Sequence, residues 1–262
     1  MRNPVFRLLL PFMGLAGLVQ AGPYAPPAGQ GGSTAISRDS SRFVGWATGY
    51  QDVRKGPNAT DGISDDGTVS YVPGNALGPA EGTSFNVFPL GDGGSITLTF
   101  SQPITNGAGD DFAVFENAFS DTFLELAFVE VSSNGTDFFL FPSVSLTPDP
   151  IPAFGGNVDA TNVDGLAGKY RAGYGTPFDL EVLSGTSGLD VNSVTHVRIT
   201  DVVGDGSTFD SLSNPIYDPH GTTGTSGFDL DGVGVLNAIP EPAVVAYLVL
   251  GMVPLCRFLR KR

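Results

Sequence analysis

Short stretches in which apolar and polar residues alternate recur along the chain. In residues 95–100 (SITLTF), Ile96, Leu98 and Phe100 alternate with polar side chains, which is the period of a half-buried β-strand. Similar runs follow at 111–116, 124–131, 138–141, 178–183, 194–200 and 228–236, while residues 43–50 predict an earlier strand or a loop packed on the core. Turn residues separate these runs. The pattern predicts an all-β fold, a single jelly-roll-like β-sandwich with little helix.

Two apolar runs without this alternation lie near the chain ends. At the N-terminus, Arg2 and Arg7 precede an apolar stretch, residues 8–19, and small residues lead up to Ala21. This order is typical of a secretory signal peptide. We expect residues 1–21 to be a signal peptide that signal peptidase removes after Ala21.

The C-terminal run covers residues 243–256 and is followed by a basic cluster, Arg257, Arg260, Lys261 and Arg262. As a helix these fourteen residues would span about 21 Å, which is short against a hydrocarbon core of about 30 Å. The basic cluster predicts a C-terminus on the cytoplasmic side of the inner membrane. An ordinary short membrane anchor and a buried C-terminal helix remain alternatives.

The triplet Pro240, Glu241 and Pro242 stands immediately before this run. The triplet, the apolar span and the basic end together resemble the PEP-CTERM sorting signal of Gram-negative bacteria. The resemblance implies processing by an exosortase, transient anchoring in the inner membrane, and delivery to the cell surface or extracellular matrix, often in species that make exopolysaccharide. Pro254 and the shortness of the span depart from a stable anchor and suit a temporary one.

Between these ends the sequence predicts a flexible Pro/Gly-rich leader at 22–42 and one β-sandwich domain at 43–238, followed by the sorting signal at 239–262. A single all-β domain can reach this length. The only cysteine, Cys256, lies in the C-terminal apolar run, so we expect no disulfide in the exported domain.

The predicted exported segment is strongly acidic. The two ends hold six of the 13 basic residues and one of the 27 acidic residues, which leaves seven basic and 26 acidic residues and a net charge of −19. Such a charge repels nucleic acid, which we therefore exclude as a partner, and it attracts divalent cations.

A second resemblance covers most of this segment. The segments that carry it are similar to a bacterial cell-surface domain with the strand pattern of galactose-binding-like and discoidin-like sandwiches; they are GDGGSITLTF, DDFAVFENAF, LAFVEVSSNGTDF, AGKYRAGYGTPFDL, THVRITDVVGD and GFDLDGVGVLN. It implies surface attachment or glycan binding, commonly with calcium.

Carboxylates near the ends of the predicted strands are candidate metal ligands. Calcium takes six to eight oxygen ligands from such side chains and from carbonyl groups. The candidates for a structural Ca²⁺ site are Asp110, Asp111, Glu116, Asn117, Asp201, Asp229 and Asp231. The alternative is that these residues cap turns and solvate the surface. No EF-hand loop fits the sequence.

Aromatic residues in loop-like stretches are candidates for stacking on sugars. They are Trp46, Tyr170, Tyr174 and Tyr217, and the alternative is that they close the ends of the sandwich. His196 and His220 are the only histidines, and no nucleophile elbow or zinc motif is present. We expect a non-catalytic surface or matrix protein; a calcium-dependent carbohydrate-binding module and a hydrolase of matrix polysaccharide are the alternatives.

Overall fold

The computed structural model describes residues 21–59, 62–63, 70–222 and 225–240. Within these ranges the helices are short 3-10 turns, η1 (Pro73–Ala76), η2 (Ala160–Asn162) and η3 (Leu180–Leu183). The remaining regular structure is β-strand. The prediction of an all-β fold with little helix is confirmed for the described residues.

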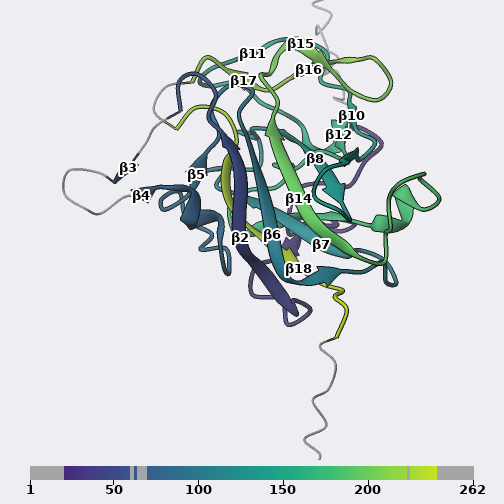
Figure 1. The fold of residues 1–262 in the computed structure, drawn as a ribbon. Coiled ribbons are helices and arrows are strands. Elements are labelled where there is room, and N and C mark those ends of the chain that lie inside the picture. Colours follow the sequence, from purple (N-terminus) through teal and green to yellow (C-terminus); the bar gives the residue numbers. More distant parts are fainter. Residues whose placement is uncertain (1–20, 60–61, 64–69, 223–224, 241–262) are drawn as a thin grey trace, which may run out of the picture.

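One large curled sheet of antiparallel strands organises the fold (Figure 1). Its strands follow the order β1 (Ile36–Ser37), β13 (Tyr174–Phe178), β7 (Phe112–Glu116), β18 (Asp229–Val235), β2 (Gly45–Arg54), β6 (Ser95–Ile104), β14 (Val194–Asp201), β8 (Ala127–Ser132) and β9 (Phe139–Leu140), with β5 (Phe88–Pro89) paired to β18. Strand β2 turns the corner, because Gly45 and Trp46 pair with β18 whereas residues from Ala47 onward pair with β6. The two halves of the sheet therefore share one core in a sandwich-like arrangement.

Small two-stranded sheets connect the long strands. They are β3 (Gly62–Ile63) with β4 (Ser70–Tyr71), β10 (Val144–Ser145) with β12 (Val163–Asp164), β15 (Asp205–Phe209) with β16 (Pro215–Tyr217), and the parallel pair β11 (Ile151–Pro152) and β17 (Pro219–His220). Except for β3 and β4, these pairs gather at the upper end of the molecule in Figure 1. Leu124, Leu126, Leu166 and Ile216 are fully buried there in a second apolar cluster.

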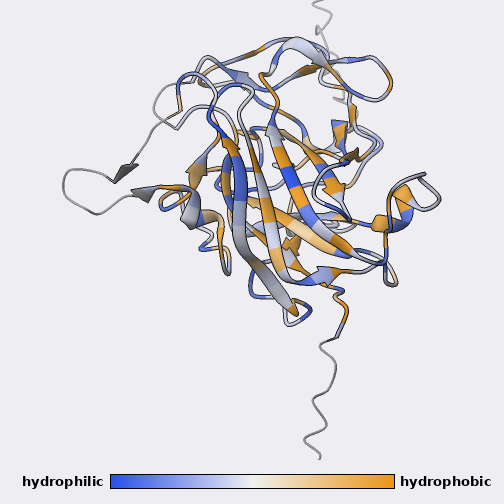
Figure 2. Cartoon of the chain, in the orientation of Figure 1, coloured by the Kyte–Doolittle hydropathy of each residue, from blue (hydrophilic) through white to orange (hydrophobic). Residues whose placement is uncertain are grey.

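The main core lies between the two halves of the curled sheet. Ile96 and Leu98 on β6 and Val197 and Ile199 on β14 are fully buried, and they meet residues of β7 and β18 from the other half. The polar residues between them point outward, and Figure 2 shows this alternation along β14. The predicted period-2 pattern at 95–100 and 194–200 is confirmed.

Strand β7 is buried on both faces. Phe112 and Val114 face the main core, whereas Phe115 on the opposite face contacts Phe43 and Trp46 at ring-centroid distances of 5.7 and 5.4 Å. All residues of β7 and β18 are buried. Acidic residues on these strands are therefore shielded from water.

One predicted strand is wrong and another is shorter than expected. Of residues 178–183, only Phe178 belongs to a strand, and Leu180–Leu183 form η3 because the Asp179 side chain accepts a hydrogen bond from Glu181 N and caps the turn. Strand β8 begins at Ala127, so Glu125 lies before it. Just before β8, Leu126 N donates to Asp218 Oδ2 at 2.8 Å, so at both places an acidic side chain accepts from a backbone N–H.

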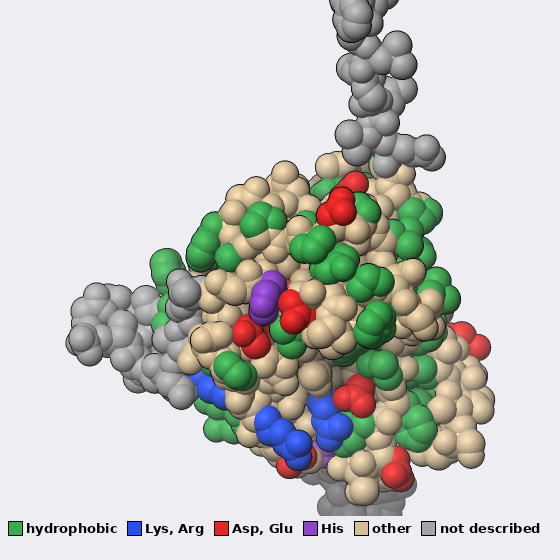
Figure 3. Space-filling model, turned by 90° about the horizontal axis from the view of Figure 1, so that it is seen from above, with side chains coloured by type: hydrophobic (Ala, Val, Ile, Leu, Met, Phe, Trp, Pro, Cys, Tyr) green, Lys and Arg blue, Asp and Glu red, His purple; other side chains and the backbone are tan. Residues whose placement is uncertain are grey.

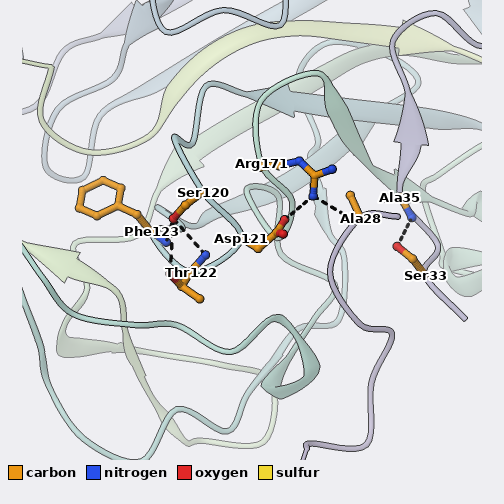
Figure 4. A network of polar contacts seen from close by, with 8 residues as sticks. All are labelled: Ala28, Ser33, Ala35, Ser120, Asp121, Thr122, Phe123 and Arg171. Atoms are coloured by element: carbon orange, nitrogen blue, oxygen red, sulfur yellow. Dashed lines mark hydrogen bonds and ion pairs between the residues drawn. The ribbon is translucent and has the colours of Figure 1, made fainter. Parts of the chain in front are cut away.

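The segment expected as a flexible leader, residues 22–42, makes defined contacts with the body. Strand β1 pairs with β13, and Ile36 is 5% exposed. Arg171 Nη1 donates to Ala28 O at 2.9 Å and to Asp121 Oδ1 at 2.6 Å (Figure 4). Hydrogen bonds to the body and the buried side chains of Ala28 and Ile36 thus hold parts of this Pro/Gly-rich segment against the rest of the protein.

The predicted membrane-interacting segments fall almost wholly outside the described residues. This holds for residues 1–20 of the signal peptide and for Glu241, Pro242, Arg257, Arg260, Lys261 and Arg262 of the sorting signal, while Pro240 is described and exposed. Within the described part of the chain, no helix has the length and apolar character needed to cross a membrane.

Candidate metal centre

Two buried carboxylates meet where β7 ends and β18 begins. Glu116 is the last residue of β7 and Asp229 is the first residue of β18, and the pairing of Glu116 with Leu230 brings them together. Each residue is 1% exposed. Two strands with strongly apolar sequences thus place two acids in the interior, where an uncompensated negative charge is costly.

Each of these carboxylates has one oxygen with a well-placed donor and one without. Glu116 Oε2 accepts from Ala118 N at 2.7 Å, and Asp229 Oδ2 accepts from Asn117 Nδ2 at 3.0 Å. Glu116 Oε1 and Asp229 Oδ1 are buried, and no atom in the described part of the chain meets either of them in good hydrogen-bond geometry, although the Thr225 side chain and the charge of Lys55 lie near enough to Asp229 to lower its pKa. Buried polar atoms almost always have a hydrogen-bond partner, so we expect each of these two oxygens to bind a proton or a cation.

Further buried acids surround this pair. Burial raises the pKa of Glu116 well above its usual range, and the negative charge of Asp229 raises it further. Burial also raises the pKa of Glu125 well above its usual range, with a contribution from Glu116, and that of Asp218, with a contribution from Asp201. Burial raises the pKa of Asp201 and of Asp229 to about 7. The interior at this end of the sheet therefore disfavours negative charge.

Two other predicted ligands, Asp201 and Asp231, have both oxygens occupied. Asp201 accepts from Gly93 N at 2.8 Å and from Phe228 N at 2.6 Å. Asp231 accepts from Glu81 N at 2.9 Å and from Gly82 N at 2.7 Å. These carboxylates bind backbone N–H groups of loops at the ends of strands. This is the role in the alternative interpretation, in which the acids cap turns.

Asp110 and Asp111 lie at the opposite end of β7 from Glu116. Asp111 accepts from Gly107 N, Leu180 N and Asn237 Nδ2 at 2.8, 2.8 and 2.9 Å, and it is fully buried. Asp110 lies 3.5 Å from an Arg42 nitrogen. A strand of five residues spans roughly 16 Å, so one ion cannot join these acids to Glu116. Of the seven predicted ligands, the structure brings together Glu116, Asn117 and Asp229.

Sequence reasoning missed Glu125 and Asp218. Glu125 is 5% exposed, and its Oε1 accepts from Thr222 Oγ1 at 3.3 Å. Asp218 is 2% exposed, and its Oδ2 accepts from Leu126 N at 2.8 Å. The only sequence signal was for Glu125, an acid inside the predicted strand of residues 124–131. Because Glu125 alternates with Leu124 and Leu126, the strand pattern favours a position for it on the outer face.

The donor set is made of oxygen atoms, which favours a hard cation such as Ca²⁺. Among the described residues, no three Asp, Glu, His or Cys side chains converge at metal-ligating distance. Glu116 and Asp229 are the acids that keep a buried oxygen outside good hydrogen-bond geometry among the described residues. The other ligands of such an ion would be carbonyl oxygens and water.

The four predicted sugar-stacking residues each contact other parts of the protein. Trp46 packs on Phe43 at a ring-centroid distance of 4.7 Å, and the Arg171 guanidinium lies 4.7 Å from the centre of the Tyr174 ring. Tyr170 is 1% exposed and Tyr217 packs on Gly206, where an added Cβ would lie 2.4 Å from the tyrosine ring. Burial of Tyr170 excludes stacking of a sugar on its ring in this conformation.

Comparisons of the chain with protein-family models, with curated proteins and with solved structures found no match.

Proposed function

We propose that this chain is an exported, non-catalytic protein of a Gram-negative cell surface or extracellular matrix, with a galactose-binding-like jelly roll stabilised by calcium. The observation that carries the proposal is the pair of buried oxygens, Glu116 Oε1 and Asp229 Oδ1, that lack a donor in good hydrogen-bond geometry within the described ranges. The PEP-CTERM-like tail and the acidic composition of the exported segment support the same compartment.

Calcium suits these two acids for electrostatic reasons. Bound Ca²⁺ would offset the negative charge of the two carboxylates in place of the proton that burial otherwise favours, in addition to the charge of Lys55 near Asp229. Asn117 Nδ2 holds Asp229 Oδ2 at 3.0 Å, and Ala118 N holds Glu116 Oε2 at 2.7 Å, so the unpartnered oxygen of each residue has a fixed direction. Extracellular modules bind Ca²⁺ with Kd values of about 10⁻⁴ to 10⁻³ M, a range that two carboxylates with neutral ligands would match.

Thermal unfolding of the full chain in mild detergent tests the calcium site. After chelator treatment, CaCl2 should raise the Tm of the wild-type protein, and the double variant Glu116→Gln and Asp229→Asn should not respond. The matched control is Asp110→Asn, which removes an acid that pairs with Arg42 at the other end of β7. Absence of any Tm rise and of any heat on calorimetric titration of the wild-type protein contradicts the proposal.

The proposed route of export has its own test. We expect signal peptidase to remove residues 1–21, the tail to hold the chain briefly in the inner membrane, and an exosortase to cut near Pro240 before release toward exopolysaccharide. Fractionation of producing cells with an antibody to the folded body should find a shortened chain at the surface or outside the cell. Retention of the full-length form in the inner membrane would contradict this route.

A second candidate function, carbohydrate binding, is favoured by a polar cavity on the outer face of β2, β6, β14 and β8. The cavity has a volume of about 400 Å³ and is lined by Asp52, Arg54, Glu130, Arg198 and their neighbours. The Arg198 guanidinium lies 3.5 Å from the centre of the Phe138 ring, and its Nη1 lies 3.7 Å from Glu130 Oε2. Figure 3 shows basic side chains gathered along one edge of the molecule, with acidic side chains beside them.

Such a cavity offers fixed donors and acceptors to the hydroxyl and carboxylate groups of a sugar. Affinity electrophoresis in gels that contain the producer's exopolysaccharide should retard the wild-type protein, and Arg54→Ala should migrate faster than wild type. Arg42→Ala is the control, because it removes the same charge from outside the cavity lining. Equal migration of Arg54→Ala and wild type would exclude this cavity as the binding site.

A further inference from the structure

The backbone of Gly22 docks on a turn that lies far along the chain. Gly22 N donates to Thr161 Oγ1 at 2.6 Å, and Tyr24 N donates to Thr161 O at 3.0 Å. Thr161 belongs to η2, which is followed directly by β12. Gly22 is therefore held at a defined point of the folded body.

Asp159 organises the turn that receives Gly22. Its Oδ1 accepts from Thr161 N at 2.9 Å and from Thr161 Oγ1 at 2.7 Å. Because the Thr161 hydroxyl gives its proton to Asp159, its lone pairs remain to accept from Gly22 N. A chain of hydrogen bonds thus runs from Gly22 through a hydroxyl to a carboxylate, and such chains polarise one another.

The space around Gly22 admits no side chain. A Cβ at position 22 would lie 2.2 Å from Thr161 O and 2.3 Å from Asn162 Oδ1, far inside contact distance. Two oxygen atoms therefore lie close to the Gly22 backbone in addition to Thr161 Oγ1. The surroundings of this residue are rich in acceptors and include one carboxylate.

Gly22 is the residue that becomes the first of the chain if signal peptidase cuts after Ala21. We infer that Asp159, Thr161 and Asn162 form a binding seat for the α-ammonium group of the processed chain. Hydrolysis of the Ala21–Gly22 bond consumes one water, leaves Ala21 with a carboxylate, and leaves Gly22 with an amine that takes up a proton. One amide N–H is thereby replaced by three N–H donors and a positive charge.

The consequence is a fold that gains stability when it is processed. Hydrogen bonds from charged donors are shorter and about twice as strong as those between neutral groups. The precursor and the processed chain share the same seat, but only the processed chain brings a charge that complements Asp159. The inference rests on the proposed export, since export supplies the signal peptidase.

Three forms of the chain that differ only at the N-terminus and all end at Arg262 test the seat in mild detergent at pH 6. One begins with free Gly22 after removal of a cleavable leader, one retains Ala21, and one is acetylated at the Gly22 nitrogen. We expect the free form to melt about 2–4 °C above the other two, which is the shift that a gain of about 1 kcal/mol produces in a domain of this size. Equal Tm values for the three forms would overturn the inference.

Variants locate the effect. Asp159→Asn should abolish the Tm advantage of the free form, and Asp149→Asn, which removes an exposed acid, should leave that advantage unchanged. Mass spectrometry of the protein exported by producing cells separates the seat from the export route. A first residue other than Gly22 overturns both the cleavage site and the seat, whereas a chain that begins at Gly22 with no Tm advantage overturns the seat alone.

Discussion

Replacement of Asp111 by asparagine distinguishes a structural clamp from a metal ligand. The carboxylate is fully buried and accepts hydrogen bonds from Gly107 N, Leu180 N and Asn237 Nδ2 at 2.8 to 2.9 Å. An asparagine keeps one acceptor oxygen and turns the other into an amide group, which faces a backbone N–H that it cannot accept from. We therefore expect Asp111→Asn to destabilise the fold.

The size of the loss follows from the donors left unpaired. One buried N–H without an acceptor costs about 1–3 kcal/mol, and loss of the charge weakens the remaining bonds, so the total should be about 2–3 kcal/mol. For a domain of this length each kcal/mol lowers Tm by about 2–4 °C, which gives a fall of about 4–12 °C. Asp110→Asn is the matched control, because Asp110 is only partly buried beside Arg42.

Differential scanning calorimetry of the chelated protein, with and without added calcium, is the assay. A clamp lowers Tm by the same amount in both conditions and leaves the calcium-induced rise intact. If Asp111→Asn removed the calcium-induced rise and left the Tm of the chelated protein unchanged, Asp111 would be a metal ligand and the present reasoning would be wrong.

Three further outcomes are expected. Burial raises the pKa of Asp201 and Asp229 to about 7, whereas an aspartate in the unfolded chain has a pKa of about 3.9, so the folded state binds more protons than the unfolded state between these two pH values. The urea midpoint of the chelated protein should therefore fall as the pH rises from 4 to 7, and an unchanged midpoint would contradict the burial argument. Phe112→Ala removes a fully buried ring and should cost about 3–5 kcal/mol in urea unfolding, whereas Phe119→Ala, at a position 67% exposed, should cost under about 0.5 kcal/mol. Gly204→Ala should lower the Tm of thermal unfolding by several degrees, because the φ of Gly204 is +77° and the new Cβ would lie 1.8 Å from an oxygen of the buried Asp218. A Tm equal to that of the wild-type protein would contradict this and show that the loop relaxes freely.

The alternation of apolar and polar residues was sufficient to predict the strands that have one buried and one solvated face. Ile96, Leu98, Val197 and Ile199 alternate with polar residues in the sequence and all point into the core. The pattern failed at 178–183, where the alternation of FDLEVL is that of a strand. There the Asp179 side chain accepts a hydrogen bond from Glu181 N and caps a 3-10 helix. The alternation of apolar and polar residues does not indicate such a local hydrogen bond.

The candidate metal centre was predictable only in part. The sequence analysis selected acids near the ends of predicted strands, and three of the selected residues, Glu116, Asn117 and Asp229, do lie together. Asp111 and Asp231 carry the same sequence signal, yet backbone N–H groups occupy both of their oxygens. For Asp111 these come from Gly107, four residues away, and from the distant Leu180, and for Asp231 they come from the distant loop at 81–82. Which acids keep an unpartnered oxygen depends on where those loops pass.

The sequence by itself determined the all-β class and the main strand positions, because a side-chain period of two is a local property of the backbone. It also supplied the expectation of export, since both end segments can be read without knowledge of the fold. The tertiary structure alone decided that β7 is buried on both faces, that Glu116 meets Asp229, and that Gly22 docks on Thr161. The residues of these two contacts lie far apart in the sequence, and only the pairing of β7 with β18 and the docking of residues 22–24 on η2 bring them together.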